Sequence, residues 1–220
     1  MATKFVKMKI TLKEVMPYPL ASMQHGENSI WGKNIELLPG NKVMLNASSG
    51  KGKSTFINTV LGIRTDYKGS VTFDSMDVKN LSTGDWTNIR QRKISAIFQD
   101  LQLFPSISVK ENLLLKNNLT QAFSTDQILG FLDFLGIVDK WEQQCGLLSM
   151  GQQQRVAIIR ALCQPYEWLL MDEPFSHLDE DNTQRCLKLI IDRCEEQKSG
   201  FVLTSLGDYH GIQYDQTLML

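Results

Sequence analysis

The sequence predicts an α/β fold in which a mostly parallel sheet carries helices on both faces. Two short apolar runs, residues 94–98 and 168–171, are typical of strands buried inside such a sheet. Segments with helical periodicity separate the apolar runs, and this alternation indicates parallel strands joined by helices. Residues 4–15 instead alternate apolar and charged side chains, which predicts an additional antiparallel β portion at the N-terminal end.

The strands are expected mainly in the first hundred residues. Residues 4–15 predict an edge strand that stops at Pro17, and residues 28–38 predict a second antiparallel strand. Residues 43–45 and 70–73 predict further strands, and residues 94–98 predict one at the centre of the sheet.

The middle of the chain is expected to be helical. Within residues 101–145, short groups of apolar residues recur at helical spacing, which predicts a small helical subdomain. Ser149 is a natural N-cap for a helix that Pro165 closes. We expect one domain, residues 1–220, in which residues 1–100 and 164–220 form the core and residues 101–163 the subdomain.

The C-terminal part predicts one more helix and two more strands. Leu187, Ile190, Ile191 and Cys194 form an apolar face, so residues 180–197 predict a helix that Gly200 ends. Residues 201–204 and 217–220 predict the last strands.

Composition excludes several classes of protein. A formal net charge of -1 leaves no basic field for non-specific nucleic-acid binding. The chain contains four cysteines without metal-ligand spacing, so we expect reduced thiols in the cytoplasm. We find no signal-peptide core and no apolar run that could span a bilayer, so a membrane is expected to be met only through a partner.

The segment between residues 43–45 and the next helical pattern predicts a phosphate-binding loop. Backbone N–H groups in a tight glycine turn form an anion cradle, and the following helix adds its positive end. Lys53 can reach the outer phosphates, and Ser54 can bind magnesium. The alternative is a polar surface loop. The candidate phosphate-binding residues are Ala47, Ser48, Ser49, Gly50, Lys51, Gly52, Lys53, Ser54 and Thr55.

Two carboxylates follow the apolar run at residues 168–171. Asp172 and Glu173 are expected at the carboxyl end of a parallel strand, where ligands bind in such folds. Asp172 can hold magnesium opposite Ser54, and Glu173 can polarise an attacking water. The alternative is a solvated acidic turn.

Four segments, in their order along the chain, resemble the motifs of ATP-binding cassette (ABC) ATPases, the nucleotide-binding subunits of ABC transporters. Gln99 resembles the Q-loop, residues 148–157 the signature segment, residues 170–174 the Walker B strand, and residues 176–179 the D-loop. The resemblance covers nearly the whole chain. In its short length the chain resembles the lipoprotein-release, macrolide-export and cell-division cassettes of bacteria. It implies the P-loop NTPase fold of the ABC type.

The resemblance implies that two cassettes, identical or homologous, pair head to tail around ATP and Mg²⁺. Ser149, Gly151 and Gln152 of one would then contact the nucleotide held by the other. It also implies that Asp179 communicates between the two sites. Tyr18 lies near the position of the adenine-stacking residue, and the alternative is a packed surface tyrosine.

The resemblance also implies a metal site and a membrane partner. Gln99 would join Ser54 and Asp172 as a magnesium ligand and would sense the attacking water. Residues 101–109 resemble the stretch that docks on the transmembrane permease subunit, and the alternative is internal packing.

Three positions depart from the family pattern. Ala47 replaces the first loop glycine, and Met150 replaces the first glycine of the signature pair. Ser205 stands where the family has a catalytic histidine, and a serine cannot carry a positive charge to the γ-phosphate. Either hydrolysis is slow, or the nearby His210 swings in.

We therefore expect an ATP-hydrolysing subunit at the cytoplasmic face of the membrane, driving a separate transmembrane permease. The alternative is a nucleotide-gated switch that dimerises with little turnover, which Ser205 and Met150 favour. DNA-repair and chromosome ATPases of related fold are disfavoured because they insert a long coiled coil before the signature. Cargo and direction are properties of the transmembrane partner.

Overall fold

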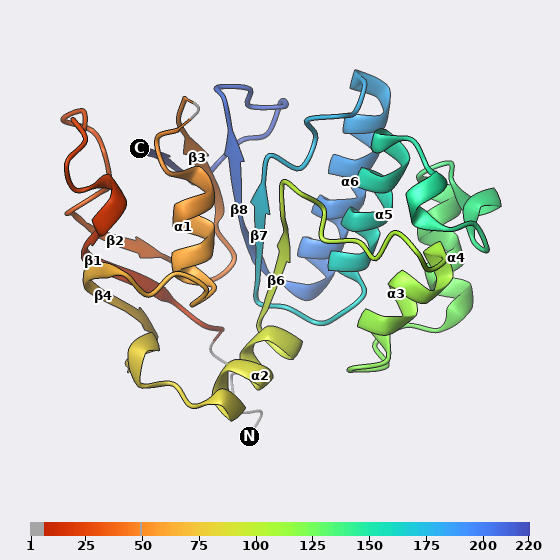
Figure 1. Ribbon diagram of the computed structural model, residues 1–220, viewed down its shortest axis with the longest axis horizontal. Coiled ribbons are helices and arrows are strands. Elements are labelled where there is room, and N and C mark those ends of the chain that lie inside the picture. The colour runs from red at the N-terminus through yellow and green to blue at the C-terminus, as the bar shows by residue number, and fades with distance from the viewer. Residues whose placement is uncertain (1–6, 49) are drawn as a thin grey trace.

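The computed structural model describes residues 7–48 and 50–220, whose strands form two sheets (Figure 1). One sheet is antiparallel, in the order β2-β1-β4-β5. Its strands are β1 (Ile10–Pro17), β2 (Asn34–Leu37), β4 (Tyr67–Phe73) and β5 (Met76–Asp77).

Two predictions about the first strands are corrected. β1 was expected at an edge, but it pairs with both β2 and β4, because its alternation reports one buried face and not its neighbours. Residues 4–6 of the expected strand lie outside the described residues. The second strand is shorter than residues 28–38, because Gly32 turns the chain with a φ of 77° before Asn34.

The second sheet is parallel, in the order β6-β7-β8-β3-β9. Its strands are β3 (Lys42–Asn46), β6 (Ile94–Ile97), β7 (Trp168–Asp172), β8 (Gly200–Ser205) and β9 (Gln216–Met219). β6 lies at an edge, so its predicted central place is wrong. The strand is apolar because both of its faces are covered: Ile94 packs into one core and Ile97 into the other.

Helices cover both faces of the parallel sheet, as predicted (Figure 1). On one face lie α1 (Lys53–Val60) and the antiparallel sheet, and on the other α5 (Met150–Leu162) and α6 (Glu180–Gln197). β7 serves both cores, with Trp168 and Leu170 on the α1 side and Leu169 and Met171 on the α5 side. The end of β7 is thereby fixed between two rigid layers.

Further helices were predicted only in part. The helical lobe contains α3 (Val109–Asn117) and α4 (Thr125–Phe134), each opened by a serine capping box. α2 (Thr83–Arg92) was missed. Short 3₁₀ turns cover Tyr18–Leu20, Val78–Asn80, Val138–Lys140 and Cys145–Leu147. Among the described helices, none combines the length and apolarity that crossing a bilayer requires.

The end of α6 differs from the prediction, and α5 contacts both parts of the chain. α6 ends at Gln197 because Lys198 adopts a left-handed conformation, with a φ of 53°, and Gly200 opens β8 rather than ending the helix. α5 packs on β6 and α6 as well as on α3 and α4. The division of the chain into subdomains at residue 163 therefore stays a prediction.

Candidate functional site

The loop between β3 and α1 lies at the carboxyl end of the parallel sheet. Gly52 precedes α1 with a φ of 106°, and a Cβ there would lie 2.7 Å from Leu20 Cδ1 and 3.2 Å from Trp31 Cζ2. Only glycine fits this approach. Ala47 is buried and its backbone is not left-handed, so alanine is accommodated at the first loop position. Ser49 lies outside the described residues.

A cavity of about 280 Å³ opens beside this loop. Its lining combines the loop backbone with side chains from two other strand ends. The lining residues are Leu20, Gly50, Gly52, Lys53, Ser54, Thr55, Gln99, Glu173 and Leu206. Seven of the nine, Glu173 included, were predicted from the loop motif or the two strand ends, whereas Leu20 and Leu206 were not. Ser48 and Lys51 belong to the same loop.

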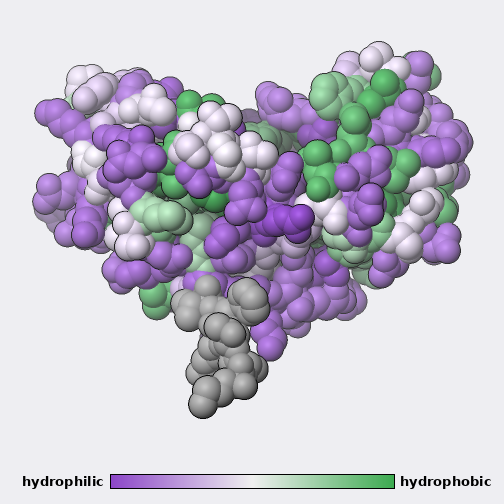
Figure 2. Space-filling model, turned by 90° about the horizontal axis from the view of Figure 1, so that it is seen from below, coloured by the Kyte–Doolittle hydropathy of each residue, from purple (hydrophilic) through white to green (hydrophobic). Residues whose placement is uncertain are grey.

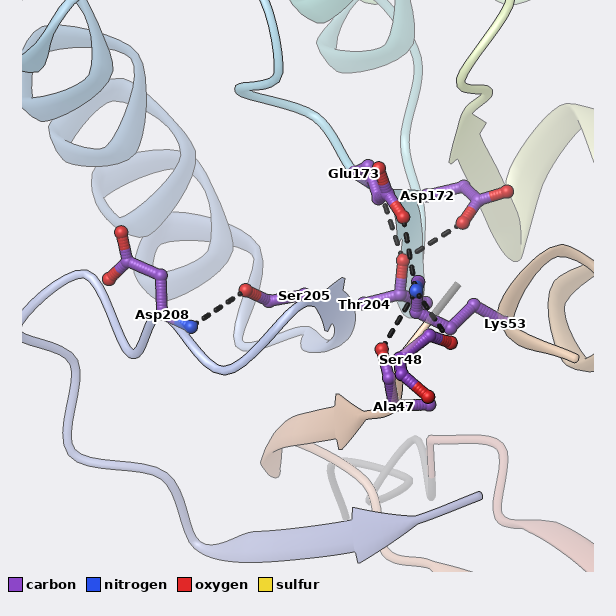
Figure 3. A network of polar contacts seen from close by, with 8 residues as sticks. All are labelled: Ala47, Ser48, Lys53, Asp172, Glu173, Thr204, Ser205 and Asp208. Carbon is purple, nitrogen blue, oxygen red and sulfur yellow. Dashed lines mark hydrogen bonds and ion pairs between the residues drawn. The ribbon is translucent and has the colours of Figure 1, made fainter. Parts of the chain in front are cut away.

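Lys53 is the buried cation of the site, with 6% of the residue exposed. Its ammonium donates to the carbonyl oxygens of Ala47 and Ser48, at 2.8 Å and 3.3 Å. It also lies 3.2 Å from Glu173 Oε1 (Figure 3). The three acceptors hold the ammonium across the gap between the loop and the end of β7.

Thr204 organises the two carboxylates. Its hydroxyl donates to Asp172 Oδ1 at 2.9 Å and accepts the backbone N–H of Glu173 at 3.0 Å (Figure 3). Sequence reasoning gave Thr204 no role. The signal is that β7 and β8 are adjacent and in register, which places Asp172 directly opposite Thr204.

Glu173 itself is turned by its backbone. Its φ is 47°, a left-handed conformation that costs about 1–3 kcal/mol for a residue with a side chain. Such strain persists only where the surroundings impose it. The bond from the Glu173 N–H to Thr204 and the ion pair with Lys53 are two such constraints.

The three predicted magnesium ligands meet at one cavity of about 780 Å³. Ser54, Gln99 and Asp172 line it together with Asp100 and His177. A hydroxyl, an amide and a carboxylate offer the oxygen atoms that Mg²⁺ prefers. Within the described residues, no cluster of three or more His, Cys, Asp or Glu side chains could hold a metal alone. The donor set therefore fits an ion whose remaining ligands are waters and phosphate oxygens.

The predicted signature segment forms the first turn of α5. Ser149 caps the helix by accepting the N–H of Gln152 at 3.3 Å, and Gln152 Oε1 accepts the N–H of Ser149 at 3.0 Å. Ser149 and Met150 are exposed. The start of α5 therefore presents its capped N-terminus outward.

The start of α5 also packs on the segment that follows Glu173. A Cβ on Gly151 would lie 2.9 Å from the carbonyl oxygen of His177. Gln154, fully buried, accepts the N–H of His177 at 2.8 Å and donates to the carbonyl of Glu173 at 3.4 Å. Gln154 was missed by sequence reasoning, because a polar residue on a helix does not show what its amide bonds.

A comparison of the sequence with known protein families matches residues 32–176 to the family described as ABC transporter. This chain belongs to the ABC transporter ATP-binding family. Its predicted family resemblance and fold class are confirmed by this match and by the structural likeness described next.

Relatives of the cassette include named and uncharacterized proteins. LolD of Hyphomonas neptunium, a lipoprotein-releasing system ATP-binding protein, is 30% identical over 79% of this chain and 78% of its own. The uncharacterized ABC transporter ATP-binding protein Rv0073 of Mycobacterium tuberculosis is 31% identical over 79% of this chain. The chain spans about half of Rv0073, 53% of its length.

A solved structure shares the fold. The dimeric structure of MJ0796, a bacterial ABC transporter cassette, has a TM-score of 0.75 and 28% identity, covering 89% of this chain and 87% of that one. The same cassette was also solved as a dimer in a post-hydrolysis state bound to ADP and Pi.

Ser205 is the residue that we expect at the position of the family's catalytic histidine. Ser205 is buried, and its hydroxyl accepts the N–H of Asp208 at 3.1 Å, pointing away from Lys53 (Figure 3). His210 lines a cavity of about 330 Å³ with Ser205 and Glu173. Its Nδ1 lies 3.4 Å from Asp208 Oδ2, and its ring stands edge-on to Phe175 at 4.9 Å. Asp208 and Phe175 thus hold His210 in this cavity.

Two further predicted residues lie at exposed positions of the cassette. Tyr18 opens a 3₁₀ turn and is 56% exposed, beside Leu20 of the loop cavity, and its stacking on adenine stays a prediction. Asp179 caps α6 by accepting the N–H of Asn182 at 2.8 Å, which holds the pKa of its carboxyl below the usual value.

Proposed function

We propose that the chain binds and hydrolyses Mg-ATP in a head-to-tail pair and powers a separate transmembrane permease. One observation carries the proposal most: Lys53 and Glu173 meet 3.2 Å apart beside the cavities lined by Ser54, Gln99 and Asp172. A phosphate-binding cation, a metal-binding set and a general base thereby converge at one strand edge.

The residues divide the chemistry as follows. Lys53 and the backbone N–H groups of the loop bind the outer phosphates. Glu173 accepts a hydrogen bond from the attacking water and orients it, while Thr204 fixes the backbone of Glu173. Ser54, Gln99 and Asp172 would hold Mg²⁺, which neutralises charge that develops on the phosphate oxygens.

The pair is proposed because the signature segment is exposed and lines no part of the cavity beside the chain's own loop. Ser149 and the backbone of Gly151 sit at an exposed helix N-terminus, which favours a phosphate. In the pair they would contact ATP held by the Lys53 of the second cassette. The dimeric structures of MJ0796 support this arrangement.

The permease is proposed to dock in a groove of about 450 Å³ beside residues 101–109. Internal packing describes part of this stretch, because Leu101 is buried and Leu103 packs on the core. Docking suits Phe104, which is 55% exposed and lines the groove. Figure 2 shows hydrophobic side chains gathered on the helical lobe beside the notch between the two lobes. Docking there would hold the cassette at the cytoplasmic face.

A second function is favoured by Ser205. If Ser205 leaves the γ-phosphate without a cationic partner, the cassette would bind ATP and dimerise with little turnover. Its role would then be a nucleotide-gated switch of a membrane complex.

Steady-state phosphate release tests the proposal. The purified cassette is expected to hydrolyse Mg-ATP with a specific activity that rises with protein concentration, because two chains form each site. Glu173→Gln is expected to abolish release. ATP binding without release, with or without a permease, would favour the switch, and absence of ATP binding would contradict both functions.

A further inference from the structure

The chain contains three histidines, His25, His177 and His210, which lie in different surroundings. His25 Nε2 lies 2.8 Å from the carbonyl oxygen of Leu20, and His210 pairs with Asp208. His177 instead lines the cavity of about 780 Å³ that contains the proposed magnesium ligands. It is exposed there, and the division of chemistry proposed above leaves it without a role.

The cavity lined by His177 continues into the cavity beside the phosphate-binding loop. Ser54 and Gln99 line both of them. The loop cavity is also lined by Lys53 and Glu173, the residues proposed to bind the outer phosphates and to orient the attacking water. A γ-phosphate bound between Lys53 and a metal ion at Ser54 would therefore face the space that His177 lines.

The backbone of His177 is fixed against α5. The buried amide of Gln154 accepts its N–H at 2.8 Å, and a Cβ on Gly151 would lie 2.9 Å from its carbonyl oxygen. Both partners belong to α5, the helix that begins with the predicted signature segment. The imidazole is therefore attached to a fixed point at the edge of the cavity.

A chain of hydrogen bonds orients the imidazole. Gln154 Nε2 donates to the Ser176 hydroxyl at 3.4 Å, and this hydroxyl lies 3.0 Å from His177 Nδ1. Because the hydroxyl accepts from Gln154, its own proton can go to Nδ1, which places the ring hydrogen of a neutral His177 on Nε2. Within residues 7–48 and 50–220, Nε2 has no hydrogen-bond partner.

A ring nitrogen that carries a hydrogen donates a hydrogen bond and does not bind a metal. In agreement, the described residues contain no cluster in which His177 and two acidic or sulfur side chains could hold a metal ion. The group that suits Nε2 is an acceptor, and a phosphate oxygen is a strong one.

We propose that His177 donates from Nε2 to a γ-phosphate oxygen of ATP and supplies the imidazole contact that Ser205 cannot. The inference rests on the proposed function, because it requires ATP in the loop cavity. The Ser205 hydroxyl is already engaged by the N–H of Asp208. The imidazole would thus come from the segment after β7 instead of the end of β8, and hydrolysis is favoured over the switch.

Equilibrium binding of two nucleotides to the full chain tests the contact without turnover. His177→Ala is expected to weaken binding of an ATP analogue with a non-cleavable imido bridge about tenfold. It should leave ADP affinity unchanged, because ADP lacks the γ-phosphate. His177→Gln places an amide N–H near the position of Nε2 and should keep most of the affinity. His210→Ala is the matched control and should alter neither affinity.

Phosphate release tests whether His177 replaces the missing histidine. His177→Ala is expected to lower kcat about tenfold or more, and adding Ser205→His to this variant should restore it. If the two imidazoles serve one phosphate, the gain from Ser205→His is larger in His177→Ala than in the unaltered chain. Urea unfolding confirms that each variant is folded.

The outcomes separate this inference from the proposed function. Equal analogue affinity of His177→Ala and the unaltered chain, an equal loss of ADP affinity, or an equal gain from Ser205→His in both backgrounds would overturn the inference. Phosphate release by the unaltered chain would then leave the ATPase proposal standing. Absence of analogue binding to the unaltered chain would overturn both.

Discussion

The carboxylate of Glu173 lies 3.2 Å from the ammonium of Lys53, so the base proposed for catalysis forms an ion pair with the cation proposed for phosphate binding. Both side chains are largely buried, with 6% and 20% exposed. ATP must therefore exchange one negative partner of Lys53 for another as it binds.

Glu173→Gln is expected to raise ATP affinity while abolishing hydrolysis. Replacing the carboxylate by an amide removes the competing charge, so we expect severalfold tighter binding of a slowly hydrolysed ATP analogue. Equilibrium binding measures this. Glu142→Gln is the control, because Glu142 is an exposed acid that pairs with Lys110 and lines neither cavity of the site. Unchanged or weaker affinity would show that the ion pair does not compete with nucleotide.

Thr204→Val is expected to lower kcat more than it raises KM. Valine keeps the shape but leaves the Glu173 N–H without its acceptor, at a cost of about 1–3 kcal/mol. Phosphate release and urea unfolding measure the two effects. Thr204→Ser keeps the hydroxyl and should retain activity, and equal loss in both variants would refute a role for the hydroxyl.

Ser205→His is expected to raise turnover, and His210→Ala to leave it nearly unchanged. A histidine at position 205 can bring a cation to the γ-phosphate, with gains of about tenfold or more typical of such groups. His210 is engaged by Asp208 and Phe175. The kcat of both variants checks this. Loss of turnover in His210→Ala alone would mean that His210 replaces the missing histidine.

Gly151→Ala is expected to reduce both stability and turnover. The new Cβ would lie 2.9 Å from the His177 carbonyl and would push α5 away from the segment after Glu173. Thermal unfolding and phosphate release measure the effect. Gly130→Ala is the matched control, since nothing lies within 4 Å of that Cβ on α4, and alanine there favours the helix. Equal behaviour of the two variants would show that Gly151 is not packed as described.

Lys116 predicts a pH dependence of stability. Its pKa is about 8 in the folded chain against 10.5 for an ordinary lysine, so the unfolded chain binds more protons between these values. The free energy of unfolding should therefore rise with pH through this window. Urea unfolding at both ends should show a smaller rise in Lys116→Met, which removes the titrating group. An identical rise in both proteins would contradict the shifted pKa.

The sequence predicted those features that depend on local chemistry. The periodicity of residues 180–197 and the serine before residue 150 located α6 and the start of α5, because caps and apolar faces are local signals. The place of β6 at an edge was missed, since an apolar run reports covered faces and not neighbouring strands. The role of Thr204 was missed for a related reason: it depends on the register of β7 against β8.

The most direct test of the account is a crystal structure of Glu173→Gln with Mg-ATP. It is predicted to show a triphosphate in the loop beside Lys53, a metal ion near Ser54 and Asp172, and Ser149 of a second copy closing the site. A loop without nucleotide at saturating ATP, or nucleotide bound away from Lys53, would contradict the account.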